Sequence, residues 1–197
     1  MKPNLFGTDG IRAGSGAYPL DDPSLVRLGA VIGSLSPSPR ILIARDTRES
    51  GPTIEAQLCR GLGRGARVFS AGVLPTPGLA FLTRELGFDF GIMVSASHNP
   101  FSDNGIKLFN RSGEKISARL ENAISAGFPH LPFRFSLFGF CHHSYVGINF
   151  LRGKNKKQIV RIISEGAENA PRIIGICSLQ DCAGRCISFD TRHVSVR

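Results

Sequence analysis

Tryptophan is missing from this chain of 197 residues, tyrosine occurs only twice, and acidic side chains are outnumbered by basic ones, 15 to 24. No stretch approaches the ~20 apolar residues that a membrane-spanning helix needs. The first residues, 1–7, also lack the apolar core of a secretory signal. We therefore expect a globular protein of the cytoplasm, without a membrane partner, whose length suits one domain or one and a half.

The net charge of +9 would suit a nucleic-acid partner, but its distribution argues against one. Residues 1–127 hold 14 basic and 11 acidic side chains, whereas residues 128–197 hold 10 and 4, so the excess lies mostly in the last part of the chain. Lys154, Lys156 and Lys157 in that part have no aromatic platform or helical pattern around them. We expect a solvated basic face there and no nucleic-acid partner.

Short apolar segments alternate with amphipathic ones over residues 1–127. The pattern predicts strands at 40–44, 68–71, 88–94 and 106–109. It also predicts a helix that begins at Asp22 and three further helices at 54–62, 76–86 and 117–126. Residues 6–12 are typical of a strand that runs into a glycine-framed loop. Strands and helices that alternate at this spacing indicate an α/β fold, an α/β/α sandwich with a mainly parallel sheet.

The most informative stretch follows the apolar segment 88–94 and reads Ser-Ala-Ser-His-Asn-Pro at residues 95–100. Asn104-Gly105, read as a turn, and Lys107 come directly after it. Each residue alone has an ordinary interpretation, such as a turn serine, a structural histidine or a hairpin turn. Together, two hydroxyls, an imidazole, a glycine turn and a lysine at the end of a buried strand favour a site that handles a phosphoryl group.

This stretch resembles the phosphoserine loop of the α-D-phosphohexomutase family, in particular of its bacterial members that act on glucosamine phosphate. Four other blocks agree with the family in the same order, at residues 6–12, 45–51, 72–77 and 82–87. The resemblance covers the family's first domain, about residues 1–127, and then stops. One departure is Ala13, where the family usually has glycine.

The resemblance implies an isomerase in amino-sugar metabolism that works as an intramolecular phosphotransferase. Ser97, rather than Ser95, would carry a phosphoryl group and pass it to glucosamine 6-phosphate. The resulting 1,6-bisphosphate would reorient and return its other phosphoryl group to the serine, and glucosamine 1-phosphate would leave. By the same resemblance Arg12 steadies the phosphate, His98 and Lys107 lie near the transferred group, and Lys107 is a candidate proton acceptor. Mg²⁺ would bind through the phosphate on Ser97.

Other motifs of the family are not found in the sequence. These are the metal-binding Asp-Gly-Asp-x-Asp-Arg loop, the sugar-binding Glu-x-Ser-Gly-His and the phosphate-binding Arg-x-Ser-Gly-Thr. We therefore expect a truncated chain that does not turn over phosphosugar by itself. Oligomeric state cannot be inferred from these features.

Residues 128–197 differ in character from the rest of the chain. They hold seven of the 14 phenylalanines and four of the five cysteines. The pair His142-His143 and the cysteines Cys177, Cys182 and Cys186 match no zinc-site spacing. We interpret 1–127 as one domain and 128–197 as an atypical tail that is disordered or is translated out of frame.

Three alternatives remain open on sequence grounds. The chain could be another phosphohexomutase, a phosphomannomutase or phosphoglucomutase, because sugar choice would lie outside the matching blocks. It could be a phosphoserine domain that binds without catalysing. A serine hydrolase that uses Ser97 and His98 is disfavoured, because a Gly-x-Ser-x-Gly elbow is missing and adjacent residues on a strand point apart.

Overall fold

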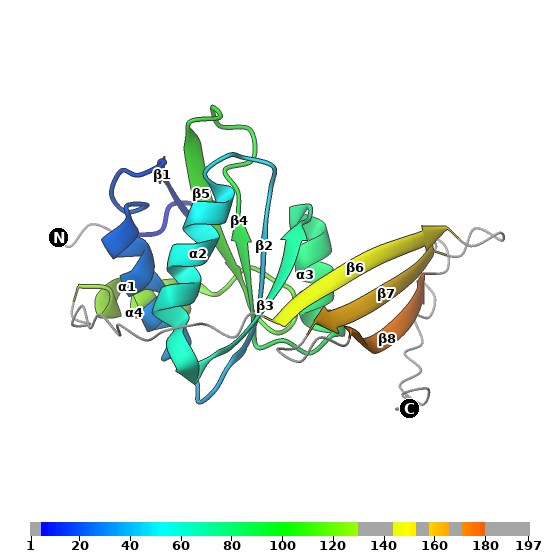
Figure 1. Cartoon of the computed structure of the whole chain (residues 1–197). Coiled ribbons are helices and arrows are strands. Elements are labelled where there is room, and N and C mark those ends of the chain that lie inside the picture. The colour runs from blue at the N-terminus through cyan, green and yellow to red at the C-terminus, as the bar shows by residue number, and fades with distance from the viewer. Residues whose placement is uncertain (1–4, 130–143, 153–157, 166–170, 180–197) are drawn as a thin grey trace. The chain divides into compact units, whose positions relative to one another are not determined.

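The computed structural model describes residues 5–129, 144–152, 158–165 and 171–179. They belong to two compact units, Met1–His142 and His143–Arg197. The described part of the first unit holds five strands and four α-helices (Figure 1). The strands are β1 (Ile11–Gly14), β2 (Arg40–Arg45), β3 (Arg67–Val73), β4 (Phe90–Val94) and β5 (Asp103–Phe109). The helices are α1 (Asp22–Gly33), α2 (Gly51–Leu62), α3 (Thr76–Glu85) and α4 (Ala118–Gly127), with a short 3-10 helix η1 (Gly63–Gly65) after α2.

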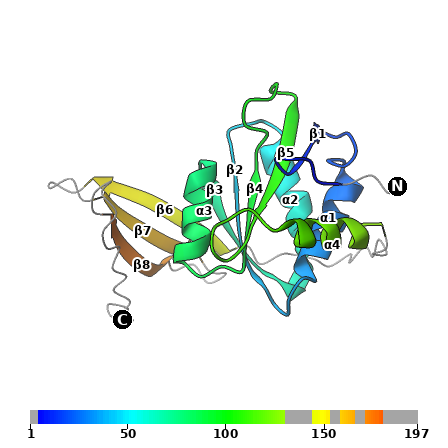
Figure 2. The same ribbon diagram turned by 180° about the vertical axis from the view of Figure 1, so that it is seen from behind.

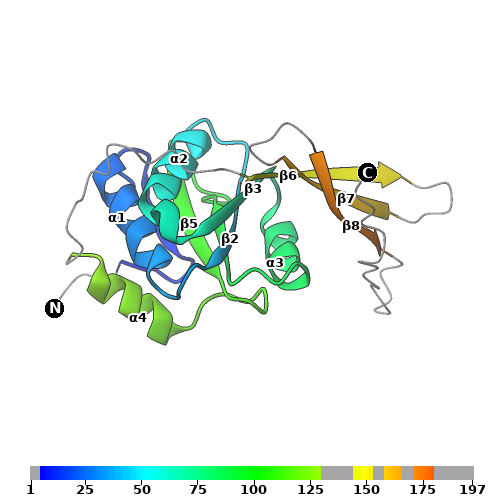
Figure 3. The same ribbon diagram turned by 60° about the horizontal axis from the view of Figure 1, so that its bottom comes forward.

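The five strands form a mixed sheet in the order β1-β5-β4-β2-β3. β2 pairs in parallel with both β3 and β4, while β4–β5 and β5–β1 are antiparallel. The antiparallel pairs arise because a short loop, and not a helical crossover, joins β4 to β5. Helices α1 and α2 cover one face and α3 the other (Figure 3). The predicted α/β/α fold is confirmed, with a parallel centre and an antiparallel edge.

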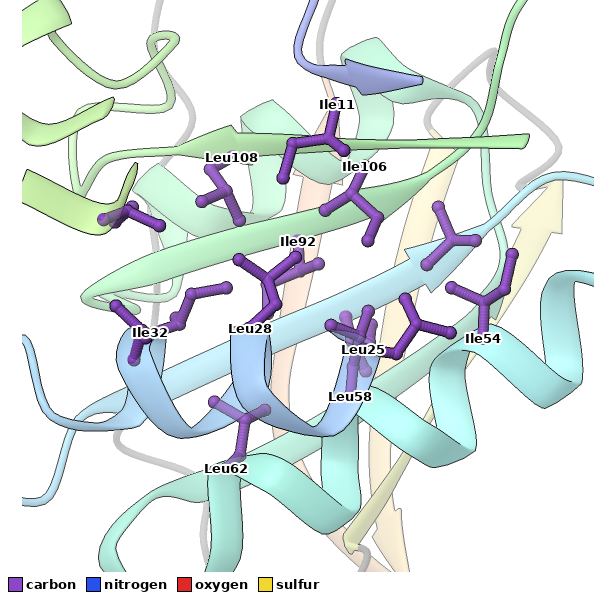
Figure 4. Close-up of a cluster of buried hydrophobic side chains, with 14 of the residues drawn as sticks. Ile11, Leu25, Leu28, Ile32, Ile54, Leu58, Leu62, Ile92, Ile106 and Leu108 are labelled. Carbon is purple, nitrogen blue, oxygen red and sulfur yellow. The ribbon is translucent and has the colours of Figure 1, made fainter. Parts of the chain in front are cut away.

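The larger core lies between the sheet and the helix pair α1–α2 (Figure 4). Strand alternation sends Ile41 and Ile43 of β2 to this side, where they meet Leu28 of α1 and Leu58 of α2. The intervening Leu42, fully buried as well, points to the α3 face. Both faces of the central strand are therefore apolar, as expected for a parallel strand covered on two sides. Helix α4 packs beside α1 (Figure 2).

Most predicted elements are found within two or three residues of their expected ends, but two local features differ. Gly7 and Gly10 form a tight bridge, so β1 begins after the glycine turn and not before it. Helix α1 is capped by Asp21, whose carboxylate accepts a hydrogen bond from the Ser24 amide at 3.1 Å. The pair Asp22-Pro23 in the sequence predicts Asp22 as the cap and Pro23 as the first helical residue, which places the cap one residue too late.

The described strands of the second unit form an antiparallel meander. β6 (Ser144–Arg152) pairs with β7 (Gln158–Glu165), and β7 pairs with β8 (Pro171–Leu179). The histidine pair 142–143, the cysteines 141, 182 and 186 and the lysines 154, 156 and 157 lie outside the described residues. The interpretation of 128–197 as an atypical tail stays a prediction. Among the described helices, each is too short or too polar to cross a bilayer.

Helices α1 and α2 touch through their backbones at two glycines. A β-carbon on Gly29 would lie 2.2 Å from the Leu58 carbonyl oxygen, and one on Gly61 would lie 1.9 Å from that of Val26. Such distances are far inside van der Waals contact, so the helices could not keep their spacing with any side chain at these positions.

Gly29→Ala should therefore lower the free energy of unfolding by about 1–3 kcal/mol, the usual penalty of overpacking. The loss would occur although alanine favours a helix by ~1 kcal/mol over glycine. Urea unfolding followed by circular dichroism measures it. Gly65→Ala is the matched control, because a β-carbon there meets nothing within 4 Å. Equal stability of the two variants would contradict this description of the helix contact.

Candidate active site

The candidate site lies where β2 and β4 end. These strands are parallel neighbours, so the loop 46–50 that follows β2 and the loop 95–102 that follows β4 leave the sheet at the same edge (Figure 1). From β2 the chain continues to β3 on one side, while β4 lies on the other. Open α/β sheets bind ligands at such a reversal of strand order, beyond the carboxyl ends of the strands.

Ser97 stands at this edge with an unusual backbone. Its φ is 55°, in the left-handed region that residues with a side chain rarely adopt. The neighbouring Ser95 is buried, and its hydroxyl accepts a hydrogen bond from the Ser97 amide at 3.1 Å. Ser97 itself is exposed. The two hydroxyls of the motif thus have different roles, since Ser95 supports the turn and Ser97 faces solvent.

Lys107 reaches Ser97 from β5. The strand returns antiparallel beside β4, with Lys107 opposite Met93, and its side chain runs to the serine loop. The Lys107 ammonium donates a hydrogen bond to Ser97 Oγ at 2.9 Å, and the side chain is only 16% exposed. The structure therefore brings together the predicted serine and the predicted lysine.

Arg12 enters from β1, on the other edge of β5. Its guanidinium donates to Asn99 Oδ1 at 2.7 Å and to Asp9 Oδ2 at 2.6 Å. The same Asp9 oxygen lies 3.8 Å from the Lys107 ammonium. Arg12 Nε is buried and has no hydrogen-bond partner within the described residues. Arg12 and Lys107 thus place two positive charges beside Ser97, with one carboxylate between them.

His98 lies apart from this group. Its side chain is exposed, and among the described residues it makes no hydrogen bond with Ser97 or another site residue. Phe101, at the tip of the same loop, is 90% exposed. The sequence motif therefore presents two of its side chains outward, while the hydroxyl of Ser97 turns to Lys107.

Arg48 is a residue whose contacts the sequence did not predict. Its guanidinium donates to four main-chain carbonyl oxygens, three of the serine loop (residues 95–102) and one at the start of β5, and the side chain is only 11% exposed. The acceptors and distances are Pro100 at 2.5 Å, Ser97 and Asn99 at 2.9 Å, and Asp103 at 3.0 Å. Every residue has a main-chain carbonyl, so the sequence does not show which of them accept hydrogen bonds. Only the position of Arg48 after a predicted strand indicated that it lies at the carboxyl ends of the strands.

Asn104 and Gly105 do not form the predicted turn, because both lie in β5. Asn104 is fully buried, donates to Ser50 Oγ at 2.8 Å and accepts from the Gly105 amide. A β-carbon on Gly105 would lie 2.9 Å from the carbonyl oxygens of both Ile11 and Ser95. Glycine is needed here for the close approach of β1 and the serine loop to β5, and not for a turn.

The described residues do not by themselves fit the expected Mg²⁺. Among them, no group of three or more histidine, cysteine, aspartate or glutamate side chains could hold a metal ion. Mg²⁺ takes oxygen ligands, usually carboxylates, phosphate and water. The carboxylate of Asp9 is already bound by Arg12 and lies near Lys107. A Ser97 phosphate would offer an oxygen, but not a full set of ligands.

Comparison with known proteins places this fold and site in a family. The family model described as phosphoglucomutase/phosphomannomutase, alpha/beta/alpha domain I, matches residues 3–134. The chain belongs to the phosphoglucomutase/phosphomannomutase family, the α-D-phosphohexomutases that the sequence resembles. The match confirms the predicted family and covers the whole of the candidate site.

Individual relatives agree with this assignment. The phosphoglucosamine mutase of Deinococcus deserti is 47% identical over 132 residues, which are 64% of this chain and 30% of that protein. The phosphoglucosamine mutase of Koribacter versatilis is 50% identical over 127 residues, 62% of this chain and 27% of that protein. The match thus spans less than a third of the length of either relative.

A solved structure shows the same fold. The crystal structure of a phosphoglucomutase/phosphomannomutase family protein from Burkholderia thailandensis matches with a TM-score of 0.55 and 28% sequence identity. The superposed part covers 64% of this chain and 30% of that one.

The left-handed backbone of Ser97 should be measurable as strain. The four variants are Ser97→Ala, Ser97→Gly, Ser102→Ala and Ser102→Gly. The glycine variant should be more stable than the alanine variant at position 97, by about 1–2 kcal/mol more than at position 102, because a left-handed backbone penalises a residue with a side chain and not glycine. Ser102 is an exposed residue of the same loop whose φ is not positive. Urea unfolding of the four variants gives the double difference, and a value of zero would rule out the strain.

Proposed function

We propose that Ser97 is the phosphoryl carrier of a phosphoglucosamine mutase, which interconverts glucosamine 6-phosphate and glucosamine 1-phosphate. The observation that carries the proposal is the hydrogen bond from the Lys107 ammonium to Ser97 Oγ at 2.9 Å, at the carboxyl edge of the parallel strands. The family assignment and the names of the relatives support the type of reaction.

The charges beside Ser97 suit a phosphoryl group. A phosphorylated serine carries close to two negative charges near neutral pH. Lys107 and Arg12 supply two positive charges on that side of the loop. Positioning and charge neutralisation are the main needs of phosphoryl transfer.

The transfer also needs a proton path. When Ser97 gives its phosphoryl group to a sugar hydroxyl, the bond from phosphorus to Oγ breaks and a bond to the sugar oxygen forms. The hydroxyl loses a proton and Oγ gains one. The Lys107 ammonium, in contact with Oγ, is placed to give a proton to the departing Oγ, and the neutral amine that results can take the proton of the sugar hydroxyl. Arg12 would hold the phosphoryl oxygens meanwhile, with His98 at the open side of the site.

The choice of glucosamine rests on the relatives. Both of those described above carry the name phosphoglucosamine mutase. A phosphomannomutase or phosphoglucomutase activity is the alternative within the family. Mg²⁺ would bind one oxygen of the Ser97 phosphate, which by itself does not supply a full set of ligands. We place the reaction in the cytoplasm as part of this proposal.

Incubation of the purified chain with glucosamine 1,6-bisphosphate and Mg²⁺ should add one phosphoryl group to Ser97. Intact-mass and phosphopeptide mass spectrometry measure the addition. Ser97→Ala should abolish it, whereas Ser95→Ala should keep it, because Ser95 is buried and serves the turn. Acylation of Ser97 by a fluorophosphonate, without any phosphorylation, would instead indicate a hydrolase.

Lys107→Met should lower the rate of this phosphorylation by about 10²–10⁴-fold, the usual contribution of a positioned acid or base. Arg111→Met removes the same charge from an exposed side chain whose ion pair, among the described residues, is with Asp89, and should leave the rate within about twofold. Single-turnover kinetics with quenched samples separate the two. A Lys107 variant as fast as the Arg111 variant would remove lysine from the reaction.

A further inference from the structure

Arg48 binds the backbone of the serine loop from inside. Its four acceptors are the main-chain carbonyls of residues 97, 99, 100 and 103. Two turn hydrogen bonds close the loop itself, from the Asn99 amide to the Ala96 carbonyl and from the Asp103 amide to that of Pro100. The guanidinium therefore binds carbonyl oxygens before and after Pro100, where the turn of residues 96–99 is followed by the turn of residues 100–103.

The guanidinium is itself held in place by the neighbouring strand ends. Asp46 accepts from Arg48 Nε at 3.2 Å and from the Arg48 amide at 3.0 Å. The Asp46 amide in turn donates to the Val94 carbonyl at 3.0 Å, at the end of β4. A continuous chain of hydrogen bonds thus runs from the sheet through Asp46 and Arg48 to the carbonyl of Ser97. The planar, rigid guanidinium suits this task better than an ammonium would.

We propose that Arg48 is a positioning residue of the phosphoryl transfer, which fixes the direction of Ser97 Oγ without touching the phosphoryl group. The inference rests on the proposed function of Ser97. Both terminal nitrogens of Arg48 are occupied by carbonyls, so its contribution is to the geometry of the serine and not to substrate affinity. Misplacement of a reacting atom by ~1 Å can slow a reaction by about a hundredfold.

The test compares Arg48→Lys with Arg45→Lys. Arg45 lies on the same strand end and is 25% exposed, but its ion pair is with Glu55, away from the serine loop. In single-turnover phosphorylation by glucosamine 1,6-bisphosphate, Arg48→Lys should lower the maximum rate by about a hundredfold and leave the half-saturating concentration within about twofold. Arg45→Lys should leave both values near those of the unmodified chain.

Hydrogen exchange of the same variants measures the loop without any reaction. The amides of Asn99 and Asp103 should exchange about ten times faster in Arg48→Lys than in the unmodified chain, whereas the amides of β2 should keep their rates. Exchange in the Arg45→Lys loop should not change. This measurement separates a local loosening of the loop from a general loss of stability.

Each outcome bears on the inference. A maximum rate near that of the unmodified chain, or a loss confined to the half-saturating concentration, would overturn the positioning role. If the unmodified chain takes no phosphate, the proposed function fails, and exchange alone then decides about Arg48. In that case faster exchange at Asn99 and Asp103 supports its hold on the loop, and unchanged exchange overturns it.

Discussion

The close approach of three backbone segments around Gly105 is the constraint on which the site depends. β5 pairs with β4 on one side and with β1 on the other, and a side chain at Gly105 would strike a carbonyl of β1 and one of the serine loop. Because that side chain is missing, the segments pack together. The same strand then brings Lys107 to Ser97, while β1 brings Arg12 to Asn99. The charges of the site are thus assembled by backbone packing.

The serine itself is held in a conformation that it would not adopt alone. A positive φ at a residue with a side chain persists only where surrounding contacts over-determine it, and such residues gather at functional sites. Here the contacts are the Ser95 hydroxyl on the Ser97 amide and Arg48 on its carbonyl. The strained backbone that fixes the direction of the Ser97 hydroxyl therefore lowers the stability of the fold.

Much of the fold could be predicted from the sequence. The apolar periodicity indicates the strands and helices, and their alternation along the chain indicates the α/β/α arrangement. The same is true of Ser97 and Lys107, which lie ten residues apart on a strand–loop–strand unit. Asn104-Gly105 was misread because a local turn signal and a long-range backbone contact both select glycine. Only the position of β1, nearly a hundred residues earlier, distinguishes them.

The role of Arg48 could not be predicted for a different reason. Its ion pair with Asp46 is local and was foreseeable, but its other partners are main-chain oxygens that every residue type possesses. His98 shows the converse, since a side chain typical of catalysis lies exposed and without a hydrogen bond among the described residues. Residue type therefore predicted the contact between Ser97 and Lys107 better than the contacts that support it.

Because Arg48 binds the serine loop only through main-chain oxygens, its hold on the loop does not depend on which outward side chains the loop carries. His98 and Phe101, which are exposed, can be replaced by other residues while the backbone of the loop keeps its path. Selection on such a loop could alter its outward surface and leave the Ser97 hydroxyl where it is. One arginine in a neighbouring loop would thus let that surface evolve separately from the position of the serine.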